Sequence, residues 1–201
     1  TIFRIFVILL LYLAVSSCVT TPAPPDSPND ICNIFHQYPK WYWAAQQARH
    51  EWKIPISTQM AIMYYESGFR GNARPPREKK FGLIPWNRPT TAYGYSQALN
   101  YTWEIYERQT GKSGKRTNFS DAIDFVAWYS HRAHVLAGIP NNDSYALYLA
   151  YHEGIGNYKK GSYRHKKWLI NVAHRVDRRA HMYRKQLLRC ESKLPKKPWW
   201  Y

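Results

Sequence analysis

The sequence predicts an all-α domain, and three observations support this prediction. Apolar residues between positions 41 and 190 recur at intervals of three and four, which is the spacing of one helix face. No stretch alternates apolar and polar residues convincingly, as a half-exposed strand would. Gly111 and Gly138 directly follow periodic segments, where glycine commonly ends a helix. We therefore expect several helices around one core, in a single domain over residues 35–192.

Two helices and a long irregular segment are predicted in the first half of the domain. A helix is predicted over 41–52, because its apolar residues share one side: Trp41, Ala44, Ala45, Ala48 and Trp52. Pro55 interrupts the pattern, and Ser57 is the expected N-cap of a second helix from Thr58 to about Ser67. Residues 68–91 then form a long irregular segment, and its aromatic content favours an ordered one.

The second half is expected to be helical with short breaks. We predict a helix over 102–110, and another over 121–137 with Ser120 as its N-cap. Asn142 or Asp143 caps a short helix that ends near His152. The glycines between 154 and 161 predict a turn-rich loop. The last helix, from about 165 to 190, has one apolar stripe: Trp168, Val172, Val176, Ala180, Tyr183 and Leu187.

The N-terminal residues indicate export. Residues 1–17 contain one charge and then a short apolar run, as in a secretory signal peptide. Small residues precede Cys18 as in a bacterial lipobox, so we expect Cys18 to carry lipid; the alternatives are an ordinary cleaved signal or a short membrane anchor. Val19 then favours the outer membrane of a Gram-negative cell and a periplasmic domain. Residues 18–34 are predicted to be a flexible tether, and 193–201 a C-terminal tail.

Cys32 and Cys190 remain near the two ends of the domain once Cys18 is assigned to lipid. An oxidising periplasm allows such a pair to form a disulfide, and the alternative is two free thiols. No metal motif and no phosphate-binding glycine loop is present, so we expect no metal and no cofactor.

The formal net charge of +16 favours an anionic partner, and the basic residues concentrate in 159–197. Export argues against nucleic acid. The remaining partners are cell-wall glycan with its peptide carboxylates, lipid head groups, or acidic proteins of an envelope or secretion assembly. The alternative is a basic face that is only solvated.

Three short motifs point to chemistry. Glu66 ends a largely apolar run and is followed by Ser67, Gly68 and Phe69. A carboxylate among apolar groups has a raised pKa, and can therefore act as an acid near neutral pH. The other motifs are Tyr93-Gly-Tyr-Ser-Gln97 and Ala150-Tyr-His-Glu-Gly154.

In this order the three motifs resemble those of the soluble lytic transglycosylase (SLT) domain of bacterial cell-wall enzymes, which is related to goose-type lysozyme. The resemblance covers about 41–190 and implies a lysozyme-like helical domain with a glycan-binding cleft. It implies that Glu66 acts first as acid and then as base, and that the product is 1,6-anhydro-muramic acid in peptidoglycan. It also implies that Gln97 lines the glycan groove and that the Tyr151 hydroxyl faces Glu66. From the residues themselves, Ser67 could contact the substrate beside the acid, or be a simple helix C-terminal residue, and Tyr95 is one of the aromatic residues that could stack on a sugar. His152 could tune Glu66, hydrogen-bond the sugar, or simply pack.

This sequence departs from the family pattern at Tyr95-Ser96, where Leu-Met is usual, and at His152-Glu153, where Asn-Ala is usual. Glu153 could be the base of a lysozyme-type hydrolase, or it could pair with a nearby Arg or Lys. A third possibility is a peptidoglycan-binding component with weak or no turnover.

Overall fold

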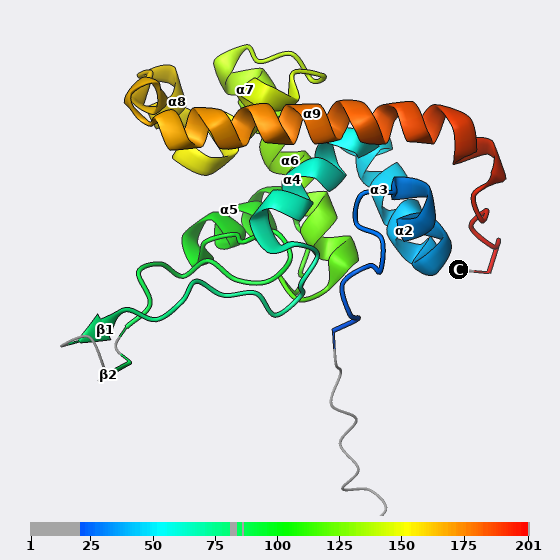
Figure 1. Ribbon diagram of the computed structural model, residues 1–201, viewed down its shortest axis with the longest axis horizontal. Coiled ribbons are helices and arrows are strands. Elements are labelled where there is room, and N and C mark those ends of the chain that lie inside the picture. The colour runs from blue at the N-terminus through cyan, green and yellow to red at the C-terminus, as the bar shows by residue number, and fades with distance from the viewer. Residues whose placement is uncertain (1–20, 81–83, 86, 201) are drawn as a thin grey trace, which may run out of the picture.

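The computed structural model describes residues 21–80, 84–85 and 87–200, and this part of the chain is mainly helical (Figure 1). The predicted signal segment 1–17 and Cys18 lie outside the described residues. The helices are α2 (Ile31–Gln37), α3 (Pro39–Trp52), α4 (Ile56–Ser67), α5 (Asn100–Thr110), α6 (Phe119–Ala137), α7 (Ser144–Glu153), α8 (Ile155–Lys159), η1 (Ser162–His165), α9 (Lys167–Cys190) and η2 (Glu191–Lys193). None of the described helices combines the length and the apolar content needed to cross a membrane.

Helix α9 runs across most of the helical body, and α4 and α7 pack against it (Figure 1). Helix α4 is the most buried element, because α3, α6 and α9 all contact it. This burial explains why its sequence shows no polar stripe: eight consecutive residues, from Ile56 to Met63, are buried. A helix that is surrounded by others needs apolar or hydrogen-bonded side chains on every side.

The helix ends confirm some of the predicted caps and correct others. Gly111 and Gly138 end α5 and α6, both at a φ of 68°, a left-handed backbone that glycine adopts without strain. Asp143 caps α7 by accepting a hydrogen bond of 2.9 Å from the amide of Ala146. The caps predicted at Ser57 and Ser120 are wrong, because each serine lies within its helix.

Two loops contain more structure than the sequence predicts. The segment 154–161 was expected to be a turn-rich loop, but it contains α8, so this prediction is wrong. The irregular segment 68–91 contains a two-residue antiparallel pair, β1 (Lys79–Lys80) with β2 (Ile84–Pro85), although no strand was predicted. This pair projects away from the helical body (Figure 1).

The end of the predicted tether is folded. Asp30 caps α2 through hydrogen bonds from the amides of Cys32 and Asn33, and Ile31 and Ile34 are fully buried. The prediction of a flexible tether is therefore wrong for residues 31–34. It is also wrong for the segment before them, because Ala23, Asp26, Pro28 and Asn29 form hydrogen bonds with the helical domain. Helix α2 has only seven residues, which is too few for a periodic pattern of apolar residues to be recognised in the sequence. Tertiary packing holds such a short helix in place.

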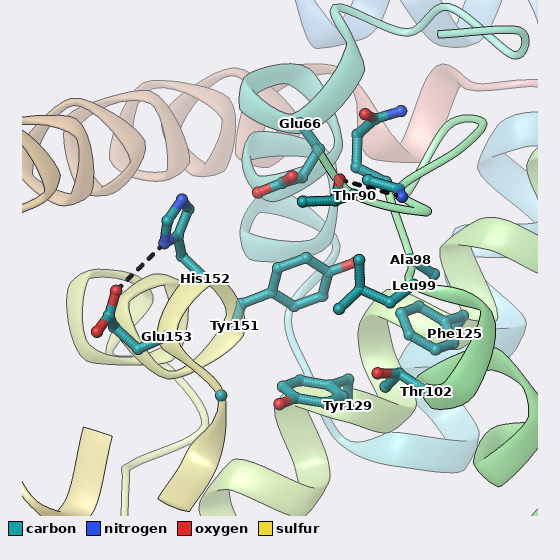
Figure 2. A pocket seen from close by; sticks show the side chains of 13 residues that line it. Glu66, Thr90, Ala98, Leu99, Thr102, Phe125, Tyr129, Tyr151, His152 and Glu153 are labelled. Carbon is teal, nitrogen blue, oxygen red and sulfur yellow. Dashed lines mark hydrogen bonds and ion pairs between the residues drawn. The ribbon is translucent and has the colours of Figure 1, made fainter. Parts of the chain in front are cut away.

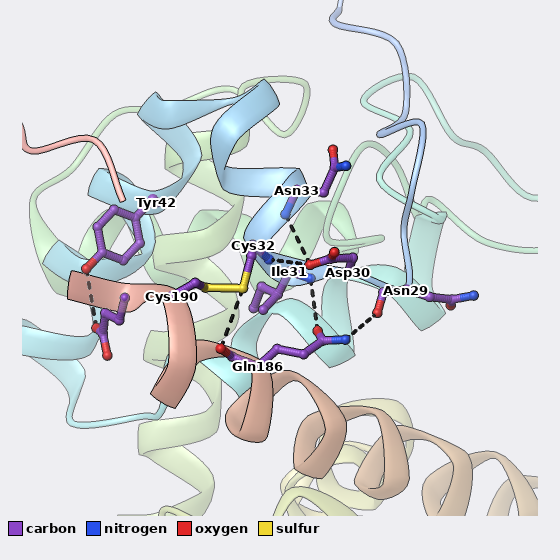
Figure 3. The surroundings of a disulfide bond; sticks show 9 residues. Asn29, Asp30, Ile31, Cys32, Asn33, Tyr42, Gln186 and Cys190 are labelled. Carbon is purple, nitrogen blue, oxygen red and sulfur yellow. Dashed lines mark hydrogen bonds between the residues drawn. A yellow bond between two sulfur atoms is a disulfide. The ribbon is translucent and has the colours of Figure 1, made fainter. Parts of the chain in front are cut away.

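A disulfide joins Cys32 in α2 to Cys190 at the end of α9, across 158 positions of sequence (Figure 3). Gln186 reinforces this junction, because it accepts a hydrogen bond from the amide of Ile31 and donates one to the carbonyl of Asn29. The segment that precedes α2 is thus fixed to the last helix of the domain.

Candidate active site

Helix α4 delivers Glu66 to the site from its last turn. Gly68 follows with a φ of 59° and ends the helix, and Phe69, at a φ of 61°, is fully buried. Phe69 packs near Trp41 and Tyr64, which anchors the turn to the core. The position of Glu66 is therefore set by a rigid element on one side and by a buried aromatic residue on the other.

Glu66 lines a pocket of about 420 Å³, shown in Figure 2, which we call the Glu66 pocket. Its walls come from α4, from the segment before α5, and from α5, α6 and α7. The lining residues are Glu66, Thr90, Ala92, Gln97, Ala98, Leu99, Thr102, Phe125, Tyr129, Tyr151, His152, Glu153 and Gly154. The pocket thus combines two helix-borne carboxyl groups, those of Glu66 and Glu153, with aromatic rings and an amide, which is a composition suited to a sugar.

Burial raises the pKa of Glu66 from its ordinary value of 4.5 to about 8, and a hydrogen bond with Tyr148 offsets only part of this effect. The Oε1 atom of Glu66 is buried and has no hydrogen-bond partner among the described residues. A carboxyl group in these surroundings is mostly protonated at neutral pH, so it can donate a proton.

Tyr148, in α7, is a neighbour of Glu66 that the motif analysis missed. Burial and the nearby Glu66 raise the pKa of Tyr148 well above 10, so its hydroxyl keeps its proton and can donate to the carboxylate. The signal in the sequence was its position in the helix of the third motif, three residues before Tyr151. Residues three apart share a helix face, so both tyrosines point toward the same region.

The hydroxyl of Tyr151 was expected to face Glu66, but it donates a hydrogen bond of 2.7 Å to the carbonyl of Ser96. The ring lines the Glu66 pocket, and its centroid is 5.3 Å from that of Tyr129 (Figure 2). Tyr151 therefore links α7 to the second motif, while Tyr148 provides the hydrogen bond to Glu66.

The second motif forms a tight loop at the pocket. Gln97 lines the pocket, but its side-chain NH₂ group donates to the carbonyls of Ala73 (3.0 Å) and Gly94 (2.7 Å). A Cβ atom at Gly94 would come within 2.0 Å of the carbonyl oxygen of Arg116, so only glycine fits there. The amide of Gln97 thus shapes the loop, and only its oxygen is left to meet a ligand.

Two residues expected to contact substrate lie in the core. Tyr95 is fully buried and packs on Trp41 and Phe119, and it does not line the Glu66 pocket. Ser67 is also buried, and its hydroxyl donates to the carbonyl of Met63. The structure corrects both expectations: in the second motif Tyr95 packs in the core while Gln97 lines the pocket, and Ser67 lies on the core side of α4.

His152 and Glu153 both line the pocket, with different surroundings (Figure 2). His152 is exposed, and its ring lies 5.1 Å from that of Trp168. Glu153 is paired, because its carboxylate accepts hydrogen bonds from Lys166 at 2.8 Å and from Ser162 at 2.6 Å. Burial would raise the pKa of Glu153, but the hydrogen bonds from Lys166 and Ser162 outweigh it, and the pKa is lowered.

Several pocket residues were not singled out by the sequence analysis. Phe125 and Tyr129, one turn apart on α6, form a wall of the pocket, and Leu99 and Thr102 border it at the start of α5. Phe125 and Tyr129 belong to a helix whose pattern indicates only burial, so no local signal separated them from core residues. Within the described ranges, no group of three or more His, Cys, Asp or Glu side chains could hold a metal ion.

Comparison with known proteins gives one positive result. A search of curated proteins found no match. A family model described as "Transglycosylase SLT domain" matches residues 6–190, which is most of the chain. The mainly α architecture agrees with the lysozyme-like fold of such domains. The chain therefore belongs to the transglycosylase SLT domain family, whose substrate is peptidoglycan.

Proposed function

We propose that this protein is a peptidoglycan lytic transglycosylase, which cleaves the β-1,4 bond between N-acetylmuramic acid and N-acetylglucosamine and leaves a 1,6-anhydro-muramic end. The observation that supports this most directly is Glu66, a carboxyl group in a sugar-sized pocket with a pKa of about 8. At pH 7 such a group is protonated in about nine molecules of ten.

The reaction needs a single residue that first gives and then takes a proton. Neutral Glu66 protonates the glycosidic oxygen, the bond to C1 breaks, and positive charge develops on the muramic ring. The Glu66 carboxylate then removes the proton of the C6 hydroxyl, whose oxygen attacks C1 and closes the anhydro ring. Glu66 ends the cycle protonated, and no water is consumed.

Tyr148 supports both steps. Its hydrogen bond to Glu66 favours the carboxylate, which exists only between the two proton transfers. Because burial favours the neutral acid and Tyr148 favours the anion, the two effects keep both protonation states accessible during turnover. Tyr148 is a positioning residue in this scheme, since it acts through Glu66.

A hydrolase would need a second group that activates water. Glu153 is the other carboxylate that lines the described pocket, and Lys166 and Ser162 both bind it. A base that is held in an ion pair with a lowered pKa is a weak proton acceptor. These contacts support the transglycosylase over the lysozyme-type alternative.

We further propose that the protein acts in the periplasm, attached to the outer membrane by lipid on Cys18. Support comes from the signal-like residues 1–17 and from Val19 after the cysteine.

The test is mass spectrometry of the products that the full chain releases from purified sacculi. We expect anhydro-muropeptides from the wild type and none from Glu66→Gln, which keeps the shape of the side chain but cannot transfer the proton. Glu153→Gln is the matched variant: its products are expected to keep the anhydro end, whatever their rate of release.

Reducing-end products from the wild type, lost in Glu153→Gln, would replace the proposal with a hydrolase. Equal release by the wild type and Glu66→Gln would exclude Glu66 as the acid. No release by either, with sacculus binding intact, would favour a binding component.

A further inference from the structure

We propose a second ligand site, for peptide carboxylates of peptidoglycan, in a cleft at the opposite end of α4 from Glu66. This cleft, which we call the Ser57 cleft, has a volume of about 350 Å³. It is lined by Arg49, Lys53, Pro55, Ile56, Ser57, Thr58, Asn142, Ser144, Ala180, His181, Arg184, Leu187, Leu188 and Glu191. Ser57 precedes Glu66 by nine residues, which is about 14 Å along a helix axis.

The floor of the cleft is the N-terminus of α4. Its N-cap is Pro55, which provides no side-chain hydrogen bond, and its first turn has no acidic residue. The amides of Thr58 and Gln59 bond to the carbonyl of Pro55, which leaves those of Ile56 and Ser57 for a ligand. Unpaired amides at a helix N-terminus attract an anion.

Ser57 is the independent observation that points to a ligand. The residue is buried, with a relative exposure of 5%, and it lines the cleft. The neighbouring Thr58 hydroxyl bonds to that of Ser144 at 2.9 Å, whereas the Ser57 hydroxyl has no hydrogen-bond partner in the part of the chain that is described. A hydroxyl that bonds to no other group of the protein can donate to an acceptor that enters the cleft.

The walls of the cleft are basic. Within the described part of the chain, Arg184, on α9, is exposed and has no ion-pair partner, and the Lys53 ammonium bonds to the carbonyl of His50 and to no carboxylate. Glu191 is the acidic residue of the lining, and Arg49 neutralises it at 3.1 Å. Two positive charges therefore remain unopposed beside the open amides of α4.

A ligand that combines an anionic group with an apolar chain suits the cleft, because Ala180, Leu187 and Leu188 form an apolar part of its wall. The peptides attached to the glycan strands of peptidoglycan have this character: their carboxyl groups are ionised at neutral pH, and their side chains include methyl groups. The choice of ligand rests on the proposed function, whereas the anion site rests on the cleft itself. A glycan strand held by its peptide in the Ser57 cleft would contact the protein at a place separate from the Glu66 pocket, where the glycosidic bond is cleaved.

The experiment is a titration of the full chain with free stem tetrapeptide prepared from sacculi, followed by NMR and calorimetry. We expect the amide signals of Ile56 and Ser57 to shift and saturate. Arg184→Glu should weaken binding about tenfold or more, and Ser57→Ala about threefold. The same peptide with its carboxyl groups amidated should bind at least tenfold more weakly.

Arg178→Glu is the matched control, since Arg178 lies on the exposed face of α9 outside the cleft and undergoes the same change of charge. It should alter the dissociation constant by less than about twofold. An equal loss in both variants would overturn the proposal, because it would show general attraction to a basic face. Unmoved signals at Ile56 and Ser57, or equal binding of the amidated peptide, would overturn it as well.

Failure of this site can be distinguished from failure of the proposed function. Release of anhydro ends from glycan strands stripped of peptide reports on Glu66 alone and should be unchanged in Arg184→Glu. Peptide binding is measured without turnover and should persist in Glu66→Gln.

Discussion

Glu66→Gln is expected to stabilise the folded protein at neutral and alkaline pH while it abolishes turnover. Burial raises the pKa of Glu66 from 4.5 to about 8, so the folded state holds a proton that the unfolded state releases. In the wild type this carboxyl group favours folding fully below pH 4.5, and its contribution is lost as pH rises toward 8. Glutamine does not titrate, so the free energy of unfolding of Glu66→Gln does not fall in this way as pH rises.

The magnitude follows from the two pKa values. Each unit between them corresponds to 1.36 kcal/mol, so the full loss, reached above pH 8, is about 5 kcal/mol, and the loss by pH 7 is about 3 kcal/mol. For a domain of this size, 3 kcal/mol corresponds to a difference in Tm of about 6 to 12 °C. The two proteins should be nearly equal at pH 4.

The assay is thermal and urea unfolding of both proteins at pH 4, 7 and 8, with the disulfide intact. The difference between them should widen with pH. A difference that stays constant from pH 4 to pH 8 would refute the reasoning, because it would mean that Glu66 titrates alike in the folded and unfolded states.

Three further predictions concern neighbouring features. Tyr148→Phe removes the hydrogen bond that lowers the pKa of Glu66, so the alkaline limb of kcat/KM should move up by about one pH unit and kcat should fall about tenfold; an unmoved pH profile would show that Tyr148 does not act through Glu66. Cys32→Ser removes the disulfide to Cys190, and the closed loop of 158 positions predicts a loss of up to about 5 kcal/mol in the free energy of unfolding, measured in urea. Under reducing conditions, where the wild type also lacks the disulfide, the two proteins should be equally stable. Tyr151→Phe leaves the carbonyl of Ser96 without its donor, so the free energy of unfolding should fall by about 1 to 2 kcal/mol. A large drop in kcat with only this small loss of stability would indicate that the hydroxyl contacts the sugar directly.

The prediction of helices succeeded where the pattern was long and had a local stop signal. Gly111 and Gly138 ended α5 and α6 where expected, because glycine adopts the left-handed backbone at little cost. Helix α2 was missed, since seven residues are helical only through their packing on α9 and through the disulfide. The N-cap predicted at Ser120 was wrong because Asn118, one residue before α6, accepts the hydrogen bonds expected of that serine.

The sequence was also informative about the acid and less so about its surroundings. Apolar neighbours of Glu66 predicted a raised pKa, and the structure raises it. Which tyrosine reaches Glu66 depends on how α7 is rotated against α4, and no local pattern encodes that rotation. In the same way Tyr95 and Gln97 stand two residues apart in one motif, yet one is core and the other lines the pocket.

The sequence by itself determined the helical class, the family motifs and the acidic group, because periodicity and residue type act locally along the chain. Tertiary structure alone decided that Glu153 is paired with Lys166, that Tyr148 binds Glu66, and that Ser57 faces a basic cleft. Each of these depends on groups from different helices meeting in space, and therefore on packing that the order of residues does not display.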